Sequence, residues 1–453
     1  TADNIVMLHF HSNLPQRTNA TFSSPTLTRL QAMALGAQRS NFMTVPTDCD
    51  QRDERLGWMG DANLSGDSMF LNFDAAAFMK FFLQGIAGEQ GADGSMTDVV
   101  PYVRFGNRPG DVSWTAAFPN LVHAAWKIAG DAGPAKMYLS GKQLQMQVDN
   151  VKSQAASGLD KMHTPYGDWC PPPVKQGGGQ GPKPSSPYTS AFSYLAMAEQ
   201  VADMANATGD AAAAATYGKL RKELNGAFNA AFLNATDGCY DGCSTQTAQV
   251  LALALGSGVT SGAGARAKTL ARLVEDILSK ETHFDVGIIG QKFLYDVLKD
   301  GGHESVSLDL LEQTDYPSLG YFFANTLEKA TENLWEIPDA PAEGTGMNSR
   351  NHHMWSSYSQ YLVRSVAGVG GDAQNTVLRP ASVDELSSAS VRMNTPNGVI
   401  AMSWENVGGI QTQRVAAGNG DAVNLSCGEG TVERVAFASF GSPRHATDML
   451  RKG

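Results

Sequence analysis

The segment from Pro46 to Asp61 holds the densest group of side chains capable of acid–base chemistry. Within sixteen residues it places five carboxylates, two arginines and one tryptophan: Asp48, Asp50, Asp53, Glu54, Asp61, Arg52, Arg55 and Trp58. Crowded carboxylates can keep one of their number protonated near neutral pH, because like charges do not all ionise in one place without a large cost. A neutral carboxylic acid is what a general acid requires. The alternative interpretation is the start of a helix, where the helix dipole favours acidic residues.

A second group of acids lies much later in the chain. It combines three carboxylates with a tryptophan and two histidines: Glu332, Glu336, Asp339, Trp335, His352 and His353. Three further segments set an acid beside a tryptophan or a glycine: Asp111–Trp114, Tyr166–Trp169 and Phe284–Gly290. Such pairs suit sugars, because an indole ring covers apolar C–H faces while carboxylates accept hydrogen bonds from hydroxyl groups. The alternative is structural, with Trp114 and Trp169 partly buried and the histidines capping helices or bonding core carbonyls.

Glycoside hydrolysis is the chemistry that two separated carboxyl groups support without a cofactor. One group donates a proton to the leaving oxygen and the other activates water. The sequence contains no His-x-x-His or Glu-x-x-His pair of metal ligands, no Gly-x-Ser-x-Gly elbow and no phosphate-binding P-loop. We therefore expect neither a metal nor a cofactor.

Composition limits the classes of partner and the compartment. The chain has 453 residues, a formal net charge of −11 and no basic block, which argues against nucleic acid and anionic membrane surfaces. No run of 18 apolar residues predicts a membrane span, and residues 1–6 show no signal-peptide pattern. Cys239 and Cys243 could pair in an oxidising compartment, and five Asn-x-Ser/Thr triplets add to the case for secretion. We expect a secreted protein, with the oligomeric state left open.

Hydrophobic periodicity predicts about a dozen helices between Thr26 and Gly371. The expected segments are 26–37, 65–81, 115–129, 136–157, 188–206, 210–232, 245–256, 266–279, 286–299, 304–312, 318–328 and 351–367. Asp210 is expected to cap one of them. Paired as six hairpins, these helices predict an (α/α)6 toroid, in which each hairpin buries its apolar face against its neighbours.

The two ends of the chain show different patterns. Residues 1–25 predict an extended lead-in with a strand at Val6–Phe10. Beyond Gly371 the pattern alternates, and Val391–Thr395 and Val399–Trp404 read as strands joined by a Thr-Pro-Asn-Gly turn. The predicted fold is therefore mainly α: a toroid over residues 26–371, followed by a small C-terminal β-sandwich over residues 372–418.

Four long loops are expected to meet at one rim of this toroid. They are residues 46–63, 88–114, 158–187 and 328–352, and between them they carry every acidic or aromatic candidate named above except those of Phe284–Gly290. Residues 170–187 are too rich in proline and glycine for regular structure and predict a surface loop. The toroid would thus bring residues distant in sequence into one pocket.

The residues from Asp48 to Asp61 (DCDQRDERLGWMGD) resemble the signature of the α-L-rhamnosidases of glycoside hydrolase family 78. The resemblance runs from about residue 8 to about residue 405. Shorter matches lie at Gln38–Phe42, Tyr166–Trp169, Gln246–Gln249, Gly287–Gly290, Leu334–Glu336 and Asn351–Met354. The family has an (α/α)6 barrel followed by a C-terminal β-sandwich, which is the architecture predicted above.

The resemblance implies a role for individual residues. Glu54 would be the general acid and Glu336 the general base in an inverting hydrolysis of terminal α-L-rhamnosides, with their carboxyl groups about 6.5–9.5 Å apart. The implied rhamnose-binding residues are Asp48, Arg52, Trp58, Asp61, Trp114, Trp169 and His353, with His352 as the alternative to the last. Asp50 departs from the proline common in the family, and an apparent extra residue near Glu336 keeps Glu332 as a rival base.

Residues 419–453 resemble the opening of a galactose/rhamnose-binding lectin domain of the sea-urchin egg lectin type. Such domains are disulfide-rich and would supply a partner for Cys427 farther on, which fits an oxidising compartment. The expected partners of the whole chain are rhamnose-containing glycosides or polysaccharides. Two alternatives stay open: another sugar-processing enzyme on the same toroid, such as a glucuronyl hydrolase or polysaccharide lyase, or a carbohydrate-binding protein without catalysis.

Overall fold

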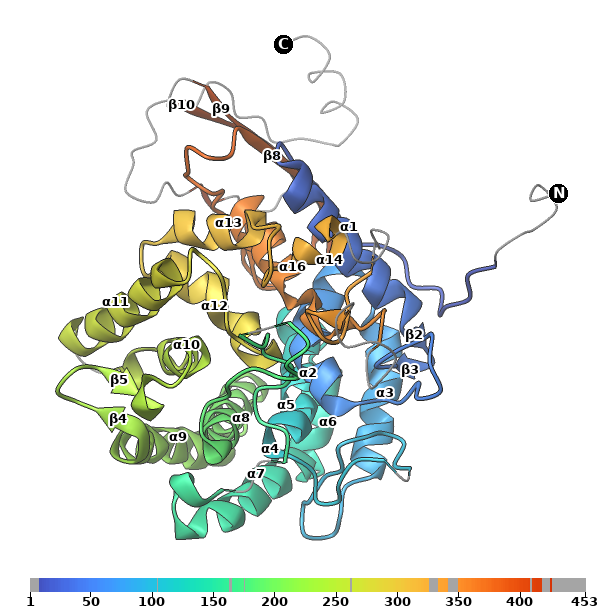
Figure 1. Ribbon diagram of the computed structural model, residues 1–453. Helices are drawn as coiled ribbons and strands as arrows, with labels where there is room; N and C mark the ends of the chain where they lie inside the picture. The colour runs from blue at the N-terminus through green and yellow to red at the C-terminus, as the bar shows by residue number, and fades with distance from the viewer. Residues whose placement is uncertain are drawn as a thin grey trace.

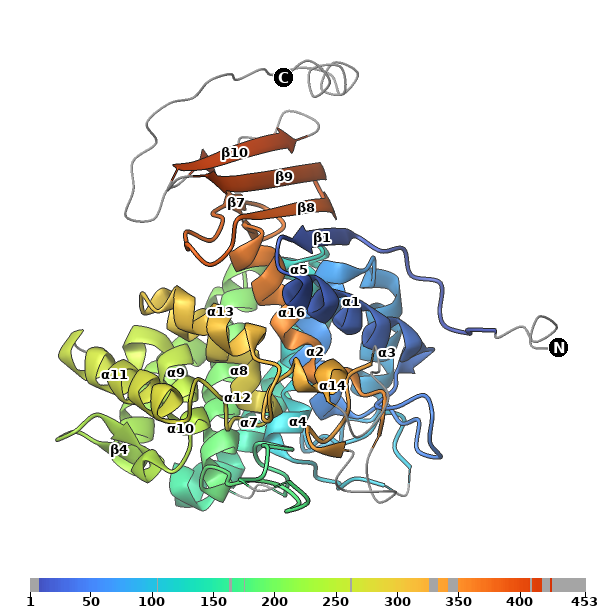
Figure 2. The same ribbon diagram turned by 45° about the horizontal axis from the view of Figure 1, so that its top comes forward.

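A computed structural model of the chain describes residues 8–103, 105–162, 165–174, 176–260, 263–325, 333–340, 349–407, 410–417 and 424–425. Its helices form a ring, and a β-sheet region lies at one end of that ring (Figures 1 and 2). No helix in these ranges is both long enough and apolar enough to cross a membrane.

The helices follow one another around the ring. They are α1 (Pro25–Ser40), α2 (Met59–Asn72), α3 (Ala76–Gly88), α4 (Val112–Thr115), α5 (Ala117–Lys127), α6 (Gly133–Ser140), α7 (Gln143–Gln154), α8 (Ser186–Thr208), α9 (Ala211–Phe232), α10 (Gln246–Ala254), α11 (Ala263–Ser279), α12 (Ile288–Asp300), α13 (Glu304–Glu312), α14 (Tyr321–Ala324) and α16 (Tyr358–Tyr361). Short single-turn segments are η2 (Ala155–Ser157), η3 (Leu159–Lys161), η4 (Asp241–Cys243), η5 (Gly256–Gly258), η6 (His353–Ser357) and η7 (Leu362–Val366).

The ring has an inner and an outer layer. The inner helices α2, α5, α8, α10, α12 and α16 are buried on most sides; in α10, eight of nine residues are buried. The outer helix α9 buries only seven of its 22 residues, and the six apolar ones among them follow the steps of three and four that mark one helical face. Figure 1 shows α9 and α11 outside α8, α10 and α12. Because inner and outer helices alternate along the chain, they form six hairpins, and the predicted (α/α)6 toroid is confirmed.

The inner helices all begin at the same rim. Trp58 precedes α2, Ser185 precedes α8, Thr245 caps α10 and Gly287 precedes α12. Asp111 caps α4, which leads into α5, and His352 precedes η6, which leads into α16. The loops that lead into these helices therefore gather at one end of the toroid. Figure 2 shows them at the end opposite the sheet.

Close packing of the inner helices depends on glycine at the start of α2. A Cβ atom built on Gly60 would lie 2.3 Å from the Trp114 ring, closer than real Cβ contacts come. The rigid indole of Trp114 is itself buried between α2 and α4. The absence of a side chain at position 60 therefore sets how near α4 can approach α2.

The strands form two small sheets, made mainly from the C-terminal part of the chain, and two short hairpins. The strands are β1 (Thr18–Phe22), β2 (Phe42–Met43), β3 (Val45–Pro46), β4 (Leu233–Asn234), β5 (Cys239–Tyr240), β6 (Val369–Gly371), β7 (Thr376–Leu378), β8 (Ser388–Thr395), β9 (Gly398–Val407), β10 (Ile410–Ala417) and β11 (Asn424–Leu425). A four-stranded antiparallel sheet has the order β1-β8-β9-β10, and a three-stranded sheet has the order β11-β7-β6. The remaining strands form two short hairpins, β2-β3 and β4-β5, and Cys239 and Cys243 form a disulfide beside the second.

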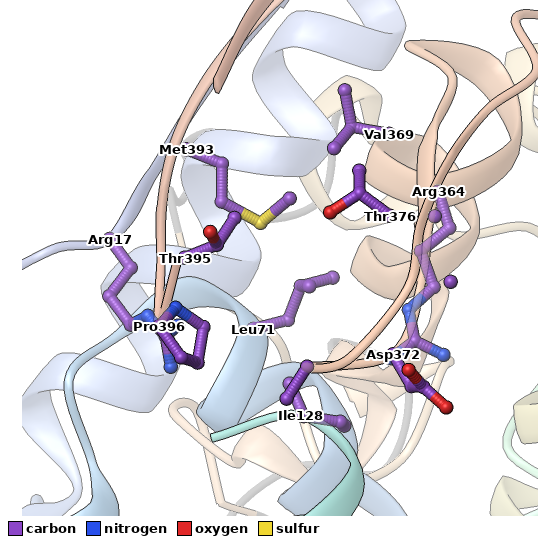
Figure 3. A pocket seen from close by; sticks show the side chains of 13 residues that line it. Arg17, Leu71, Ile128, Arg364, Val369, Asp372, Thr376, Met393, Thr395 and Pro396 are labelled. Carbon is purple, nitrogen blue, oxygen red and sulfur yellow. The ribbon is translucent and has the colours of Figure 1, made fainter. Parts of the chain in front are cut away.

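The larger sheet turns one face toward the toroid. Alternate residues of β9, Ile400, Met402 and Trp404, are buried, and the indole N–H of Trp404 donates to the carbonyl oxygen of Val366 at 3.1 Å. A small cavity of about 30 Å³ remains at this junction, where Leu71 of the toroid and Met393 of β8 face it (Figure 3). Arg17 lines the same cavity and donates to the carbonyl oxygens of Phe70 and Asn394. The junction is thus a packing seam, and none of the acidic candidates lines it.

Several details of the sequence prediction are wrong. Residues 8–10 form no strand; the lead-in strand is β1, paired in register from Thr18 with Met393 to Phe22 with Ala389. A strand needs a partner, and the partner of β1 lies far away in sequence, so the local pattern of the lead-in did not reveal which part of it would pair. Helix α2 begins at Met59 rather than near residue 65, and the 136–157 segment breaks because Lys142 adopts a left-handed conformation, with φ of 66°.

Other expectations are met, and some fall outside the described residues. Asp210 caps α9, and its carboxylate accepts from the N–H of Ala213 at 3.0 Å. The described part of the 318–328 segment contains α14. Glu332 and nearly all of residues 419–453 lie outside the described ranges, so the rival base and the lectin-like segment stay predictions, as do the domain boundaries.

We expect Gly60→Ala to destabilise the fold by about 1–3 kcal/mol, because the added methyl group overpacks against a rigid ring. The matched control is Gly218→Ala in the middle of α9, where a Cβ meets nothing within 4 Å. That change should stabilise by about 0.5–1 kcal/mol, through the higher helix propensity of alanine. Urea unfolding of both variants measures the difference, and equal effects would contradict the packing argument.

Candidate active site

Asp48 closes the loop that carries the acidic signature. Its backbone N–H donates to the carbonyl oxygen of Leu56 at 2.9 Å, and its Oδ1 accepts from the N–H of Leu56 at 2.7 Å. Arg52 and Glu54 lie on the loop that this pair closes. The loop thus leads from β3 to Trp58 at the start of α2, with its charged side chains held at the rim.

Arg52 connects the two halves of the candidate site. Its guanidinium donates to Oε2 of Glu54 at 2.5 Å and, through its other terminal nitrogen, to Oε2 of Glu336 at 2.9 Å. The same group lies 3.7 Å from Oδ2 of Asp48. Glu54 also accepts from the indole N–H of Trp58 at 2.7 Å. The two carboxylates predicted to act together therefore lie on either side of one cation.

Glu336 is buried and fixed from several directions. Its backbone N–H donates to the carbonyl oxygen of Ser349 at 3.0 Å, and its Oε2 accepts from the N–H of Ser349 at 3.0 Å. The indole N–H of Trp355 donates to the carbonyl oxygen of Glu336 at 3.0 Å. Only Oε2 of this carboxylate, facing Arg52, carries hydrogen bonds in the described part of the chain. The side chain is positioned with little freedom to rotate.

The two histidines have separate surroundings. The Nε2 of His352 lies 2.7 Å from Oδ1 of Asp61, and both side chains are buried. His353 instead forms a hydrogen bond through Nδ1 with the hydroxyl of Ser65 on α2, at 2.7 Å. The structure therefore places His352, rather than His353, within the carboxylate cluster.

The charges around His352 raise its pKa. Burial alone would lower the pKa of this imidazole, but Asp61, Glu336 and Asp48 outweigh burial and raise it to about 9. The pKa of Asp61 is lowered, because His352 outweighs the opposing effect of burial. His353, which is buried beside these groups, has a pKa lowered to about 4, mainly by burial. His352 and Asp61 are thus a buried ion pair at neutral pH.

Asp48 is the carboxyl group of the signature whose pKa is raised, to about 6. Burial is the main cause, and the nearby charges of Asp61 and Glu54 add to it, while His352 opposes them. The pKa of Asp48 is thus raised toward neutrality, with burial as the larger cause and the crowding of acidic neighbours as the smaller. Its neighbour Cys49 also lies close to Glu54, so these three side chains could approach a metal ion, but Arg52 already supplies positive charge there.

An aromatic wall borders the carboxylates, with Tyr166 at its centre. The ring of Tyr166 contacts three indoles, Trp114 at 4.8 Å between centroids and Trp58 and Trp169 at 5.8 Å each. Trp58 and Trp169 are half-buried, whereas Trp114 is buried, so Trp114 supports the wall from behind. Sequence reasoning named the three tryptophans and missed Tyr166, although it opens the Tyr-Gly-Asp-Trp match.

The hydroxyl group of Tyr166 is fixed by its neighbours. It donates to Oδ2 of Asp98 at 3.1 Å and accepts from the side-chain amide of Asn107 at 3.0 Å. The amino group of Lys183 donates to the backbone carbonyl of Tyr166 and lies 4.7 Å from the ring centroid of Trp169. The wall is therefore held by residues from two different loops, the one between α3 and α4 and the one that leads into α8.

Asp168 explains three of the short family matches. Its fully buried carboxylate accepts from the N–H groups of Gly287 at 2.7 Å and Ile289 at 2.8 Å, and from the hydroxyl of Thr247 at 2.5 Å. It thereby caps α12 and links the segments Tyr166–Trp169, Gln246–Gln249 and Gly287–Gly290. The neighbouring carbonyl of Trp169 accepts from the N–H of Ile288 at 2.9 Å. The signal missed in sequence was an acid followed at a distance by a glycine-rich helix start.

The geometry defines a class of protein: a six-hairpin toroid whose rim holds paired carboxylates beside an aromatic wall. The chain belongs to the family whose model is the bacterial α-L-rhamnosidase six-hairpin glycosidase domain, which matches residues 16–366. The family suggested by the signature at Asp48–Asp61 is thereby confirmed.

Known relatives and solved structures agree with this assignment. The chain is similar to an α-L-rhamnosidase of Streptomyces avermitilis, with 30% identity over 418 residues, covering 88% of this chain and 37% of that protein. It is similar in structure to the α-L-rhamnosidase of Dictyoglumus thermophilum, with a TM-score of 0.82, 29% identity, and coverage of 90% and 44%. The crystal structure of the Streptomyces avermitilis enzyme complexed with L-rhamnose gives a TM-score of 0.79 at 29% identity, with coverage of 88% and 37%. The chain thus spans less than half the length of these proteins.

We expect stability to fall with rising pH because of His352. The folded protein holds the His352 proton more tightly than the unfolded chain does, so this stabilisation is complete below about pH 6.5 and is lost as pH rises through about 9. A shift of this size corresponds to up to about 3 kcal/mol. Urea unfolding at about pH 6 and about pH 9.5 measures it. His352→Gln, which does not titrate, should lose clearly less, and parallel losses would contradict the assignment.

We expect Asp168→Ala to lower the free energy of unfolding by about 3 kcal/mol or more, because several buried donors lose their acceptor. The control is Thr247→Val, which removes one of those donors and should cost only about 1 kcal/mol. Chemical denaturation compares the two variants. Similar costs would show that the carboxylate does not organise the three segments.

Proposed function

We propose that this chain hydrolyses terminal α-L-rhamnosides with inversion at the anomeric carbon. The observation that carries the proposal is the single guanidinium of Arg52, which binds Glu54 on one side and Glu336 on the other. Two carboxyl groups facing one space are what glycoside hydrolysis requires. Because the chain covers under half the length of its relatives, the activity of the whole protein is part of the proposal.

Glu54 acts as the general acid. It is half-buried, with Oε1 bonded to Trp58 and Oε2 bonded to Arg52. When a substrate binds, its glycosidic oxygen takes the place of Arg52 at Oε2, and the protonated carboxyl group delivers its proton to that oxygen as the bond to the anomeric carbon breaks. The leaving group departs as a neutral alcohol, with Glu54 left as carboxylate. The leaving group must therefore lie on the side of the site that holds Glu54 and Trp58.

Glu336 acts as the general base. Its buried carboxylate takes a proton from water while the water oxygen bonds to the opposite face of the anomeric carbon. The contacts with Ser349 and Trp355 hold it in position for this step. The guanidinium of Arg52 lies between Glu336 and Glu54, so the two carboxyl groups are not in direct contact. An inverting enzyme needs such a gap, because a water molecule must fit between the base and the anomeric carbon. The separation of about 6.5–9.5 Å stays a prediction.

The sugar binds between the aromatic wall and the buried charges. The partly exposed indole rings of Trp58 and Trp169 face the apolar side of the sugar ring. The side chains of Asp48, Asp61 and His352 form hydrogen bonds with the sugar hydroxyl groups. The similar enzyme solved with L-rhamnose supports this sugar as the ligand. We assign the late histidine contact to His352, because His353 is bonded to Ser65.

We expect Glu54→Gln and Glu336→Gln each to lower kcat by about 10²–10⁴-fold on methyl α-L-rhamnoside. On an aryl rhamnoside with a strongly acidic phenol as leaving group, Glu54→Gln should recover most of its rate, because that group needs no proton to depart. Glu336→Gln should not recover, because water still requires a base. Hydrolysis rates, with NMR of the first-formed anomer, test both roles.

The matched control is Asp53→Asn, which alters a fully exposed carboxylate beside Glu54 and should leave the rate unchanged. A normal rate in either glutamine variant would remove that residue from the mechanism. A product that retains configuration would exclude inversion, and rhamnose binding without turnover by the unaltered chain would indicate a carbohydrate-binding protein.

A further inference from the structure

Within the connection between α3 and α4, the rim loop from Asp98 to Asn107 begins beside Trp58, the tryptophan that bonds the candidate acid Glu54. The N–H of Met59 donates to the carbonyl oxygen of Asp98 at 2.8 Å, and the N–H of Val100 donates to the carbonyl oxygen of Gly57 at 2.9 Å. Trp58 forms a β-bridge with Val99. Trp58, which bonds Glu54, is therefore paired through its backbone with the first part of this loop. The loop lies among the rim loops in Figure 2.

The far end of the loop returns to the aromatic wall. Asn107 donates to the buried carboxylate of Asp98 from both its backbone N–H, at 2.6 Å, and its side-chain amide, at 2.8 Å. The same amide donates to the hydroxyl of Tyr166. Both ends of the loop are thus fixed on the candidate site, one beside Trp58 and the other beside Tyr166.

Between these fixed ends the loop exposes three large apolar side chains. Tyr102 is 39% exposed, Val103 37% and Phe105 44%. Leaving such surface in water is unfavourable by roughly 25 cal/mol for each Å², and grouped exposure of this kind marks binding sites on soluble proteins. The three side chains lie on a loop that belongs to the site rather than on a remote surface.

The exposed ring of Tyr102 is held in place. The backbone N–H of Tyr102 donates to Oε1 of Glu89 at 3.1 Å. The guanidinium of Arg108 donates to the same glutamate and lies 5.4 Å from the centroid of the Tyr102 ring. One face of the phenol ring is therefore backed by a guanidinium. A ring that is both ordered and partly exposed can stack on a ligand without a large loss of conformational entropy.

We propose that Tyr102, Val103 and Phe105 form an aglycone platform, which binds the ring to which rhamnose is attached. This inference rests on the proposed function. The general acid must face the oxygen that joins rhamnose to its leaving group, so the leaving group lies on the side of Glu54 and Trp58. The platform begins three residues beyond Val99, the bridge partner of Trp58. The preferred leaving groups are aromatic rings or sugars with an apolar face.

The size of the patch argues against a protein occupant. Three side chains on one loop, with the charged Glu89 and Arg108 beside them, present much less than the roughly 800 Å² that each partner contributes to a stable protein interface. A flat ring from a glycoside needs far less surface. The aglycone is therefore the occupant that the dimensions and the position favour.

The test compares 2-naphthyl and methyl α-L-rhamnoside on the full chain. Binding is measured by quenching of tryptophan fluorescence in a Glu54→Gln background, which separates binding from turnover. Tyr102→Ser with Phe105→Ser should weaken binding of the naphthyl rhamnoside about tenfold and leave the methyl rhamnoside unchanged. The control pair is Phe81→Ser with Leu278→Ser, two exposed apolar residues on the outer helices α3 and α11, which should alter neither ligand.

Each other outcome has a defined meaning. Equal binding of the naphthyl rhamnoside by the platform variant and the control pair would overturn the platform. Equal weakening of both rhamnosides would also overturn it, since it would indicate general disturbance of the site. A change in sedimentation alone would assign the patch to contact between copies of the chain. Failure of the unaltered chain to hydrolyse methyl α-L-rhamnoside would overturn the proposed function, whereas the binding comparison reports on the platform separately.

Discussion

The guanidinium of Arg52 is the interaction on which the site depends. Glu336 is buried at the rim of a largely apolar toroid, where a carboxylate without a partner would be strongly unfavourable. Arg52 offers two terminal nitrogens in one plane, so it can bind Glu336 and Glu54 at once. A lysine could not span both in the same geometry. One side chain thereby joins a loop near the start of the chain to a segment near the end of the toroid.

The same constraint shapes the rest of the rim. Two buried charges there have such partners: Asp61 has the cation His352, and Asp168 has the backbone donors at the start of α12. The N-terminal ends of inner helices are suited to this task, because their first N–H groups have no partner within the helix. Placing six such ends at one rim creates a region where acids can be buried together. The opposite end of the toroid, by contrast, is closed by the apolar face of a β-sheet.

The proposed aglycone platform extends this arrangement outward. In the proposed function the buried charges and the aromatic wall bind one sugar, but they do not by themselves select what is attached to it. The loop between Val99 and Asn107 begins at the acid side of the site and ends at Tyr166. Its exposed side chains would therefore meet the leaving group first, and its composition could vary without altering the proposed pair of Glu54 and Glu336.

The sequence by itself determined the class of fold and the family, and it named most members of the candidate site. Helical periodicity repeats about a dozen times, and the acidic signature is long enough to be specific, so neither needed coordinates. The tertiary structure decided what depends on distant contacts. It placed Arg52 between Glu54 and Glu336, His352 rather than His353 beside Asp61, and Tyr166 among three indoles. It also paired β1 with β8 across the chain. Local patterns report which face of an element is buried, but not which remote residue covers it, and that is why these pairings could not be read from the sequence.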